Sequence, residues 1–210
     1  MNLSDMRTLV RRDLHDEDSS NYRWTNDELD RHIGHAAKEL SECLPHEQKT
    51  DMETTPGSRE LDISAVTGRV MVEAVEYPAG QYPRRFQPFS LWGDVLTILG
   101  DEMPDGSDAT VYYGKIHTLD SQGSTIPVLH EDLVCGGACG YAAVEWAIYA
   151  VNRVNAGGVA SPGEFLAWGK QKLDAFRREL RRLGRRNRVR VSSLYVPAFP
   201  ANSKTTDYGP

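Results

Sequence analysis

The sequence predicts an α+β fold: a helical bundle with an inserted antiparallel β module and an extended C-terminal tail. Three observations support this fold class. Apolar residues recur at helical spacing in residues 25–44, 130–154 and 162–186. Between residues 58 and 117 they alternate instead with polar residues, as in strands that have one buried face. Residues 188–210 are partly alternating, then polar, and have no strand partner nearby in sequence.

The clearest local signal is the start of a helix near residue 25. Thr25 can accept a hydrogen bond from the backbone N–H of Glu28, and the Glu28 carboxylate can reach back to the N–H of Thr25. Trp24 and Leu29 flank this capping box and are placed to close a hydrophobic staple. The apolar stripe that follows predicts a helix that ends before Pro45.

The remaining N-terminal half contains one more helix and several strands. Residues 4–15 have helical spacing, and Ser4 can act as their cap. Residues 46–57 are polar and are expected to form a connection. Five alternating segments separated by turn residues then predict a small antiparallel sheet or barrel-like module. These segments are residues 61–65, 70–74, 86–92, 95–99 and 110–116.

The third long helix, residues 130–154, carries three glycines at positions 136, 137 and 140. Each costs a helix about 1 kcal/mol relative to alanine. We therefore expect another backbone to approach closely along this small face. Residues 161–164 read Ser-Pro-Gly-Glu, which gives a cap, a proline in the first turn and a glutamate three residues after the cap. This pattern predicts the start of the last helix.

These patterns predict three parts of the chain. A helical bundle domain comprises residues 1–57 and 118–187, and an inserted β module comprises residues 58–117. Residues 188–210 form the extended C-terminal tail.

Length and composition indicate a cytoplasmic globular protein. The chain has 210 residues, of which 40% are hydrophobic, enough for a sizeable core. No uninterrupted apolar run approaches the roughly 18 residues that a membrane span needs, and the N-terminus lacks the order of a signal peptide. The three cysteines, Cys43, Cys135 and Cys139, are an odd number and fit a reducing compartment.

No motif predicts catalysis, a cofactor or a metal. His130 is followed by Glu but lacks the second His of a zinc protease. Cys135 and Cys139 lie one helical turn apart, but a metal site would need a further ligand such as Cys43 or His117. The glycine-rich stretch follows no strand and lacks the Lys-Ser/Thr of a phosphate-binding loop. Because carboxylates are plentiful, an enzyme with a cleft of paired carboxylates stays a third alternative.

Charge is distributed unevenly along the chain. Residues 1–132 carry 12 Lys/Arg and 25 Asp/Glu, whereas residues 133–210 carry 12 Lys/Arg and 5 Asp/Glu. Ten of the basic residues lie between positions 170 and 190. They are either the solvated face of an amphipathic helix or a surface for an acidic neighbouring subunit or DNA phosphates. The candidate interface residues on this helix are Arg178, Arg182 and Arg186.

The tail is apolar in its first half although nothing in sequence is available to cover it. Such a segment gains most by lying on another surface, where its backbone groups also find partners. The candidate contact residues are Leu194, Tyr195, Val196 and Phe199, with Tyr195 and Phe199 as anchors.

Residues 22–29, Tyr-Arg-Trp-Thr-Asn-Asp-Glu-Leu, resemble the early helix start of head–tail adaptor (connector) proteins of tailed bacteriophages. The resemblance also covers residues 112–120, Tyr-Tyr-Gly-Lys-Ile-His-Thr-Leu-Asp, the small-residue helix at 136–149, and Tyr-Val-Pro at 195–197. The order of helices, β insert, two further helices and tail is similar to that of the larger adaptors. The long β insert departs from the smallest, purely helical adaptors.

This resemblance implies a structural virion protein rather than an enzyme, with no catalytic residues and no cofactor. It implies a homo-oligomeric ring, commonly of twelve copies, beneath the portal protein at the neck of the virion. The ring would extend the DNA channel, let genomic DNA pass without sequence recognition, and dock the downstream tail component. The protein would be made in the host cytoplasm and would contact no membrane. The alternative is a nucleic-acid-binding protein that uses the Arg-rich helix at 170–190.

Overall fold

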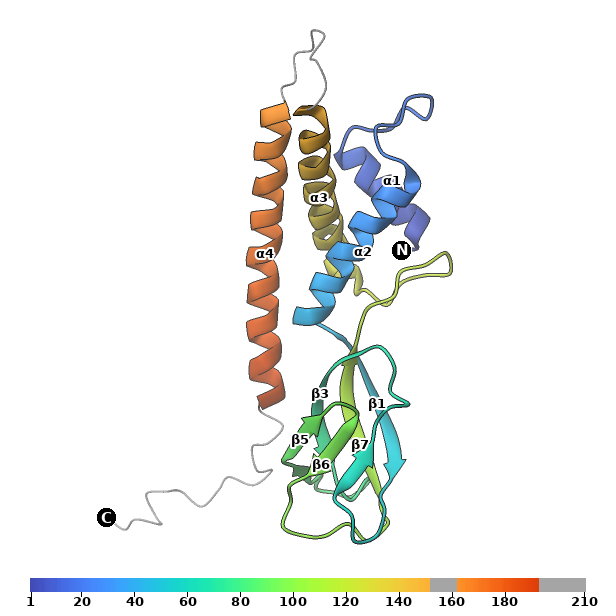
Figure 1. Ribbon diagram of the computed structural model, residues 1–210, viewed down its shortest axis with the longest axis vertical. Coiled ribbons are helices and arrows are strands. Elements are labelled where there is room, and N and C mark those ends of the chain that lie inside the picture. The colour runs from blue at the N-terminus through green and yellow to red at the C-terminus, as the bar shows by residue number, and fades with distance from the viewer. Residues whose placement is uncertain (152–161, 193–210) are drawn as a thin grey trace, which may run out of the picture. The chain divides into compact units, whose positions relative to one another are not determined.

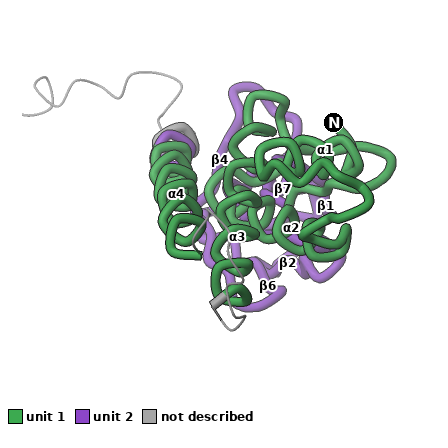
Figure 2. Tube along the Cα trace, turned by 90° about the horizontal axis from the view of Figure 1, so that it is seen from above, with its two compact units in different colours: residues 1–46, 116–185 green, residues 47–115, 186–210 purple. Residues whose placement is uncertain are grey.

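The computed structural model describes residues 1–151 and 162–192, and it confirms the mixed α+β fold class (Figure 1). The chain divides into two compact units, which Figure 2 shows in different colours. The helical unit contains residues 1–46 and 116–185. The β unit contains residues 47–115, and the chain from residue 186 onward is grouped with it.

Four α-helices and one short 3₁₀-helix are described. The helices are α1 (Leu3–Asp13), α2 (Asn26–Cys43), η1 (Val128–His130), α3 (Glu131–Val151) and α4 (Pro162–Ser192). One apolar cluster joins buried side chains of all four α-helices, and it forms the core of the helical unit.

Both N-terminal helices begin with a reciprocal capping box. The Thr25 hydroxyl accepts from the backbone N–H of Glu28 at 3.2 Å, and the Glu28 carboxylate accepts from the N–H of Thr25 at 2.7 Å, as predicted. The cap of α1 is Asn2 rather than the expected Ser4. Asn2 accepts from the N–H of Asp5 at 2.9 Å, and Asp5 accepts from the N–H of Asn2 at 3.2 Å. Asn2 was overlooked because Ser4 is an equally good capping residue by type.

A buried ion pair holds the segment between α1 and α2. Arg11 Nη1 lies 2.5 Å from Asp16 Oδ2, and Arg11 Nη2 donates to the Trp24 carbonyl at 2.9 Å. Asp16 also accepts from the backbone N–H of Arg23 at 2.7 Å. Trp24 is only 3% exposed, and its indole N–H donates to the carbonyl of Ala142 in α3 at 3.3 Å. The motif at residues 22–29 is therefore held by contacts with Arg11 and Asp16 and by a contact with α3.

One of the three glycines of α3, Gly140, lies at a close approach of another backbone, as expected. A Cβ on Gly140 would meet the carbonyl oxygen of Gly169 in α4 at 3.2 Å. A Cβ on Gly137 would meet the ring of Phe176 at 3.0 Å, so a side chain rather than a backbone fills that position. Nothing lies within 4 Å of the corresponding point at Gly136, where the expectation was wrong.

One apolar helical stretch, Val128–Ala150, has the length and composition to cross a membrane, with a mean hydropathy of 1.2. This stretch is not an uninterrupted apolar run, because it contains Glu131, Asp132 and Glu145. Half of the stretch is buried inside the helical unit, and a core helix passes the same test. Five of its buried side chains are small and belong to the apolar cluster of the helical unit: Val134, Cys135, Ala138, Cys139 and Ala142.

The β unit contains two antiparallel sheets with their own core. The strands are β1 (His46–Glu53), β2 (Glu60–Asp62), β3 (Arg69–Glu76), β4 (Phe86–Gln87), β5 (Phe89–Trp92), β6 (Val95–Ile98) and β7 (Asp108–Lys115). Their order is β1-β7-β3-β4 in one sheet and β2-β6-β5 in the other. A second apolar cluster, confined to this unit, fills their interior.

Two strand assignments differ from the sequence-based expectation. β1 occupies most of residues 46–57, which were expected to be a connection. It lies at the edge of its sheet and has no buried residue, so it needs no apolar alternation. The single strand expected at residues 86–92 is split at Pro88, because the chain there passes from the sheet of β3 to the sheet of β6. Proline cannot donate to a sheet ladder, which makes it suitable at this change.

The expected extended tail does not begin at residue 188, because α4 continues to Ser192. The alternation of Arg and Val over residues 188–191 is short, and adding residues to an existing helix is favourable once the helix has formed. Residues 193–210 lie outside the described part of the chain.

Candidate functional site

The candidate site is the solvent-facing side of α4. One side of this helix is buried in the helical core through Leu173, Phe176, Leu180 and Leu183. The other side carries six exposed arginines within ten positions, here called the arginine face. They are Arg177, Arg178, Arg181, Arg182, Arg185 and Arg186.

Few acidic side chains neutralise the arginine face. Arg182 Nε donates to Glu179 Oε2 at 2.8 Å, and this hydrogen bond raises the pKa of the Arg182 guanidinium. Arg177 donates to the Tyr141 hydroxyl of α3 at 3.3 Å. Within residues 1–151 and 162–192, neither Arg178 nor Arg186 forms an ion pair.

Within the described part of the chain, two further arginines on this face donate to the helix backbone. Arg181 Nε donates to the Arg177 carbonyl at 3.2 Å, and Arg185 Nε donates to the Arg181 carbonyl at 3.3 Å. These bonds hold both side chains along the helix. Arginine presents five N–H donors, so most donors of each guanidinium stay available to an external carboxylate or phosphate.

The four candidate contact residues of the tail lie outside the described residues. They are Leu194, Tyr195, Val196 and Phe199. Their role as docking anchors stays a prediction.

The structure exposes apolar side chains that the sequence analysis did not single out as contact residues. Trp92 is 89% exposed at the tip of the β5–β6 hairpin, beside the turn at Gly93. On α3, Ile148 is 63% and Tyr149 is 53% exposed, although Tyr149 was expected to be buried. Trp92 could have been noticed because it directly precedes a Gly-Asp turn, which places it at a hairpin tip.

A charged groove of about 500 Å³ lies between α2 and α3. Arg31 Nη2 lies 2.5 Å from Glu145 Oε1, and Nε2 of the largely buried His32 lies 2.6 Å from Glu145 Oε2. Burial lowers the pKa of His32, against the opposing effect of the Glu145 charge. Glu145 of α3 thus contacts two side chains of α2, Arg31 and His32, and these contacts tie the two helices together.

The β unit contains a hollow of about 610 Å³ that is lined by carboxylates, among them Asp51 and Glu76. Glu76 is 3% exposed and accepts from the Tyr112 hydroxyl at 2.7 Å and from the N–H of Gly80 at 3.2 Å. Asp51 accepts from the Thr110 hydroxyl at 2.6 Å. Burial and the Glu76 hydrogen bond raise the pKa of Tyr112. Each of these carboxylates is thus hydrogen-bonded within the β unit.

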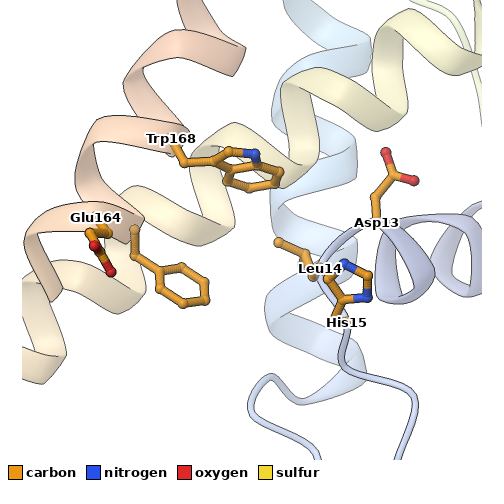
Figure 3. Close-up of a pocket in the computed structure, with 6 residues that line it drawn as sticks. Asp13, Leu14, His15, Glu164 and Trp168 are labelled. Atoms are coloured by element: carbon orange, nitrogen blue, oxygen red, sulfur yellow. The ribbon is translucent and has the colours of Figure 1, made fainter. Parts of the chain in front are cut away.

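A small apolar pocket of about 220 Å³ opens between the C-terminal end of α1 and the first turns of α4 (Figure 3). Phe165, on its wall, packs against Trp146 with ring centroids 4.6 Å apart. The lining residues are Asp13, Leu14, His15, Glu164, Phe165 and Trp168. This lining offers an apolar surface with a polar rim of Asp13, His15 and Glu164.

The metal ligands considered from the sequence do not assemble around the cysteines of α3. His117 Nε2 lies 3.0 Å from the Leu44 carbonyl, and its Nδ1 lies 3.1 Å from the Thr125 hydroxyl. Burial lowers the pKa of His117. The residue that joins Cys135 and Cys139 is instead Asp13 of α1, which the sequence analysis did not consider.

Comparison with known proteins adds no family to these observations. No protein-family model matches the chain, and no curated protein matches it in sequence.

Proposed function

We propose that this protein is a head–tail adaptor of a tailed bacteriophage, which forms a homo-oligomeric ring beneath the portal. The ring extends the DNA channel and docks the next tail component. The choice of this family is based on the resemblance of residues 22–29 and 112–120 to adaptor proteins. The observation that carries the assembly is the arginine face of α4, because it is exposed and has few partners within its own chain.

Charge complementarity supports contact between copies. The arginine face stands on a chain whose first 132 residues carry more than twice as many acidic as basic side chains. Two different surfaces that complement each other produce a head-to-tail interface, and such an interface closes into a ring when the rotation between copies permits it. Paired arginines can bind carboxylates bidentately, which fixes the orientation of a neighbour as well as attracting it.

The same features support a passive relation to DNA. The arginine face can attract phosphates without reading bases, because no aromatic residues are interleaved with its arginines. The carboxylates Asp51 and Glu76 are engaged in hydrogen bonds of the β unit. A structural role without catalysis is therefore the simpler account of the chain.

The test reverses Arg178, Arg182 and Arg186 to glutamate and measures binding to purified portal rings by co-sedimentation. The variant is expected to fold as a monomer, because all three side chains are exposed. It is expected to lose assembly on portals, because the arginine face is the proposed contact surface. A matched control reverses Arg12, Lys38 and Lys49, which are exposed elsewhere and give the same change in net charge. The control is expected to assemble normally.

The main alternative is a nucleic-acid-binding protein that uses the same face, and the same variants distinguish it. If the arginine-face variant assembles on portals but loses salt-sensitive binding to duplex DNA, the proposed function is nucleic-acid binding rather than head–tail connection.

A further inference from the structure

Three metal-binding side chains meet where α1 ends against α3. Cys135 and Cys139 lie on successive turns of α3, and Asp13 is the last residue of α1. Their sulfur and carboxylate oxygen atoms all lie within 4.8 Å of one another. Cys135 Sγ is 3.9 Å from Asp13 Oδ2. All three residues belong to the helical unit, so two packed helices fix their arrangement.

These separations suit a zinc ion. Zinc binds thiolate sulfur at about 2.3 Å and carboxylate oxygen at about 2.0–2.2 Å, which places donors of a tetrahedral site about 3.5–3.8 Å apart. The observed 3.9 Å between Cys135 and Asp13 is close to this value. The upper bound of 4.8 Å exceeds it by an amount that side-chain rotation can supply.

The three proposed ligands differ in their exposure to solvent. Cys135 and Cys139 are 2% and 0% exposed, whereas the Asp13 side chain is 39% exposed. The thiols therefore face a dry helix interface, and the carboxylate gives an ion access from solvent. Figure 3 shows the Asp13 carboxylate directed away from His15, so His15 is not part of this donor set.

The charges around the three ligands balance when zinc is bound. Two thiolates and one carboxylate carry three negative charges, and zinc brings two positive charges. The ammonium group of Lys172 lies 3.9 Å from Asp13 Oδ2 and supplies the third. Zinc binding replaces the two thiol protons, which pass to solvent.

We infer that Asp13, Cys135 and Cys139 form a zinc-binding site that ties the C-terminal end of α1 to α3. A water molecule takes the fourth position, as in sites with three protein ligands. Zinc bound here stabilises the folded state because the unfolded chain does not hold the three ligands together. The inference is independent of the proposed adaptor function.

The test is a zinc titration of the full chain, stripped of metal and kept reduced, in competition with a chromophoric chelator. One zinc per chain is expected to bind, together with a rise in melting temperature. Cobalt in place of zinc is expected to give a thiolate-to-metal charge-transfer band. Cys135→Ser is expected to lose stoichiometric binding, and Asp13→Asn to weaken it at least tenfold.

Two variants keep this test free of folding artefacts. Asp13→Asn changes an exposed side chain and keeps its shape, so its helix content is expected to be unchanged. Cys43→Ser is the matched control, because Cys43 is the third cysteine of the chain and lies outside the cluster. It is expected to bind zinc normally. Failure of the unaltered chain to bind one zinc, or equal affinity in Cys135→Ser, would overturn the inference.

Discussion

At the scale of single residues, the motif at residues 22–29 is positioned by contacts from outside it. The capping box of Thr25 and Glu28 is local and follows from sequence. The ion pair of Arg11 and Asp16 does not follow from a local pattern. Arg11 belongs to α1 and Asp16 to the segment after it, and they become partners because folding buries both. A buried ion pair that loses one member leaves an uncompensated charge, so this pair is a sensitive point of the fold.

The glycines of α3 give a prediction at the residue scale with an internal control. Gly136→Ala is expected to stabilise the protein by about 1 kcal/mol, because alanine favours helix and nothing obstructs its Cβ. Gly140→Ala is expected to destabilise it by about 1–3 kcal/mol, because its Cβ would overlap Leu173 and crowd the Gly169 carbonyl. Urea denaturation of both variants measures the difference. Equal stability of the two would contradict the described crossing of α3 and α4.

The proposed zinc site shows why such sites escape sequence analysis. Spacing of one helical turn identified Cys135 and Cys139 as neighbours. The third ligand, Asp13, is 122 positions from Cys135 in the chain, and only the packing of α1 on α3 brings it near. No local pattern marks Asp13 among the many carboxylates of the chain.

At the scale of elements, periodicity predicted the elements that have one buried face. α2, α3 and the buried part of α4 have clear apolar stripes, and their existence followed from sequence. β1 was missed because an edge strand without buried residues has no stripe to detect. The C-terminal end of α4 was missed because arginines on a solvated helix carry no stop signal.

Separate cores predict that the helical unit folds without the β unit. The apolar cluster of the helical unit draws only on residues 1–46 and 116–185, and the other cluster draws only on residues 47–115. Because β1 and β7 are neighbours in one sheet, a short Gly/Ser linker can replace residues 47–115.

The shortened chain is expected to keep its helical far-UV circular dichroism and a cooperative thermal transition. The full chain, measured beside it, provides the reference. Loss of helical signal in the shortened chain would show that the β unit is required for the helical core.

At the scale of the whole molecule, the proposed function depends on self-association. If, as proposed, the arginine face of α4 contacts the acidic first part of a neighbouring copy, the contact is head-to-tail and links one copy to the next rather than pairing two copies symmetrically. Such contacts are expected to weaken with salt, because exposed charges are screened within about 10 Å at 0.1 M ionic strength. Trp92, Ile148 and Tyr149 are exposed apolar side chains that the proposed assembly could cover.

The most direct test of the proposed adaptor function is an electron-microscopic image of the full chain incubated with purified portal rings in the absence of DNA. An adaptor is expected to form a closed ring that is seated on the portal and coaxial with its channel. The proposed function also predicts that the image of the variant with Arg178, Arg182 and Arg186 reversed to glutamate shows bare portals. Portals that stay bare with the unaltered chain, while that chain coats duplex DNA, would contradict the adaptor function.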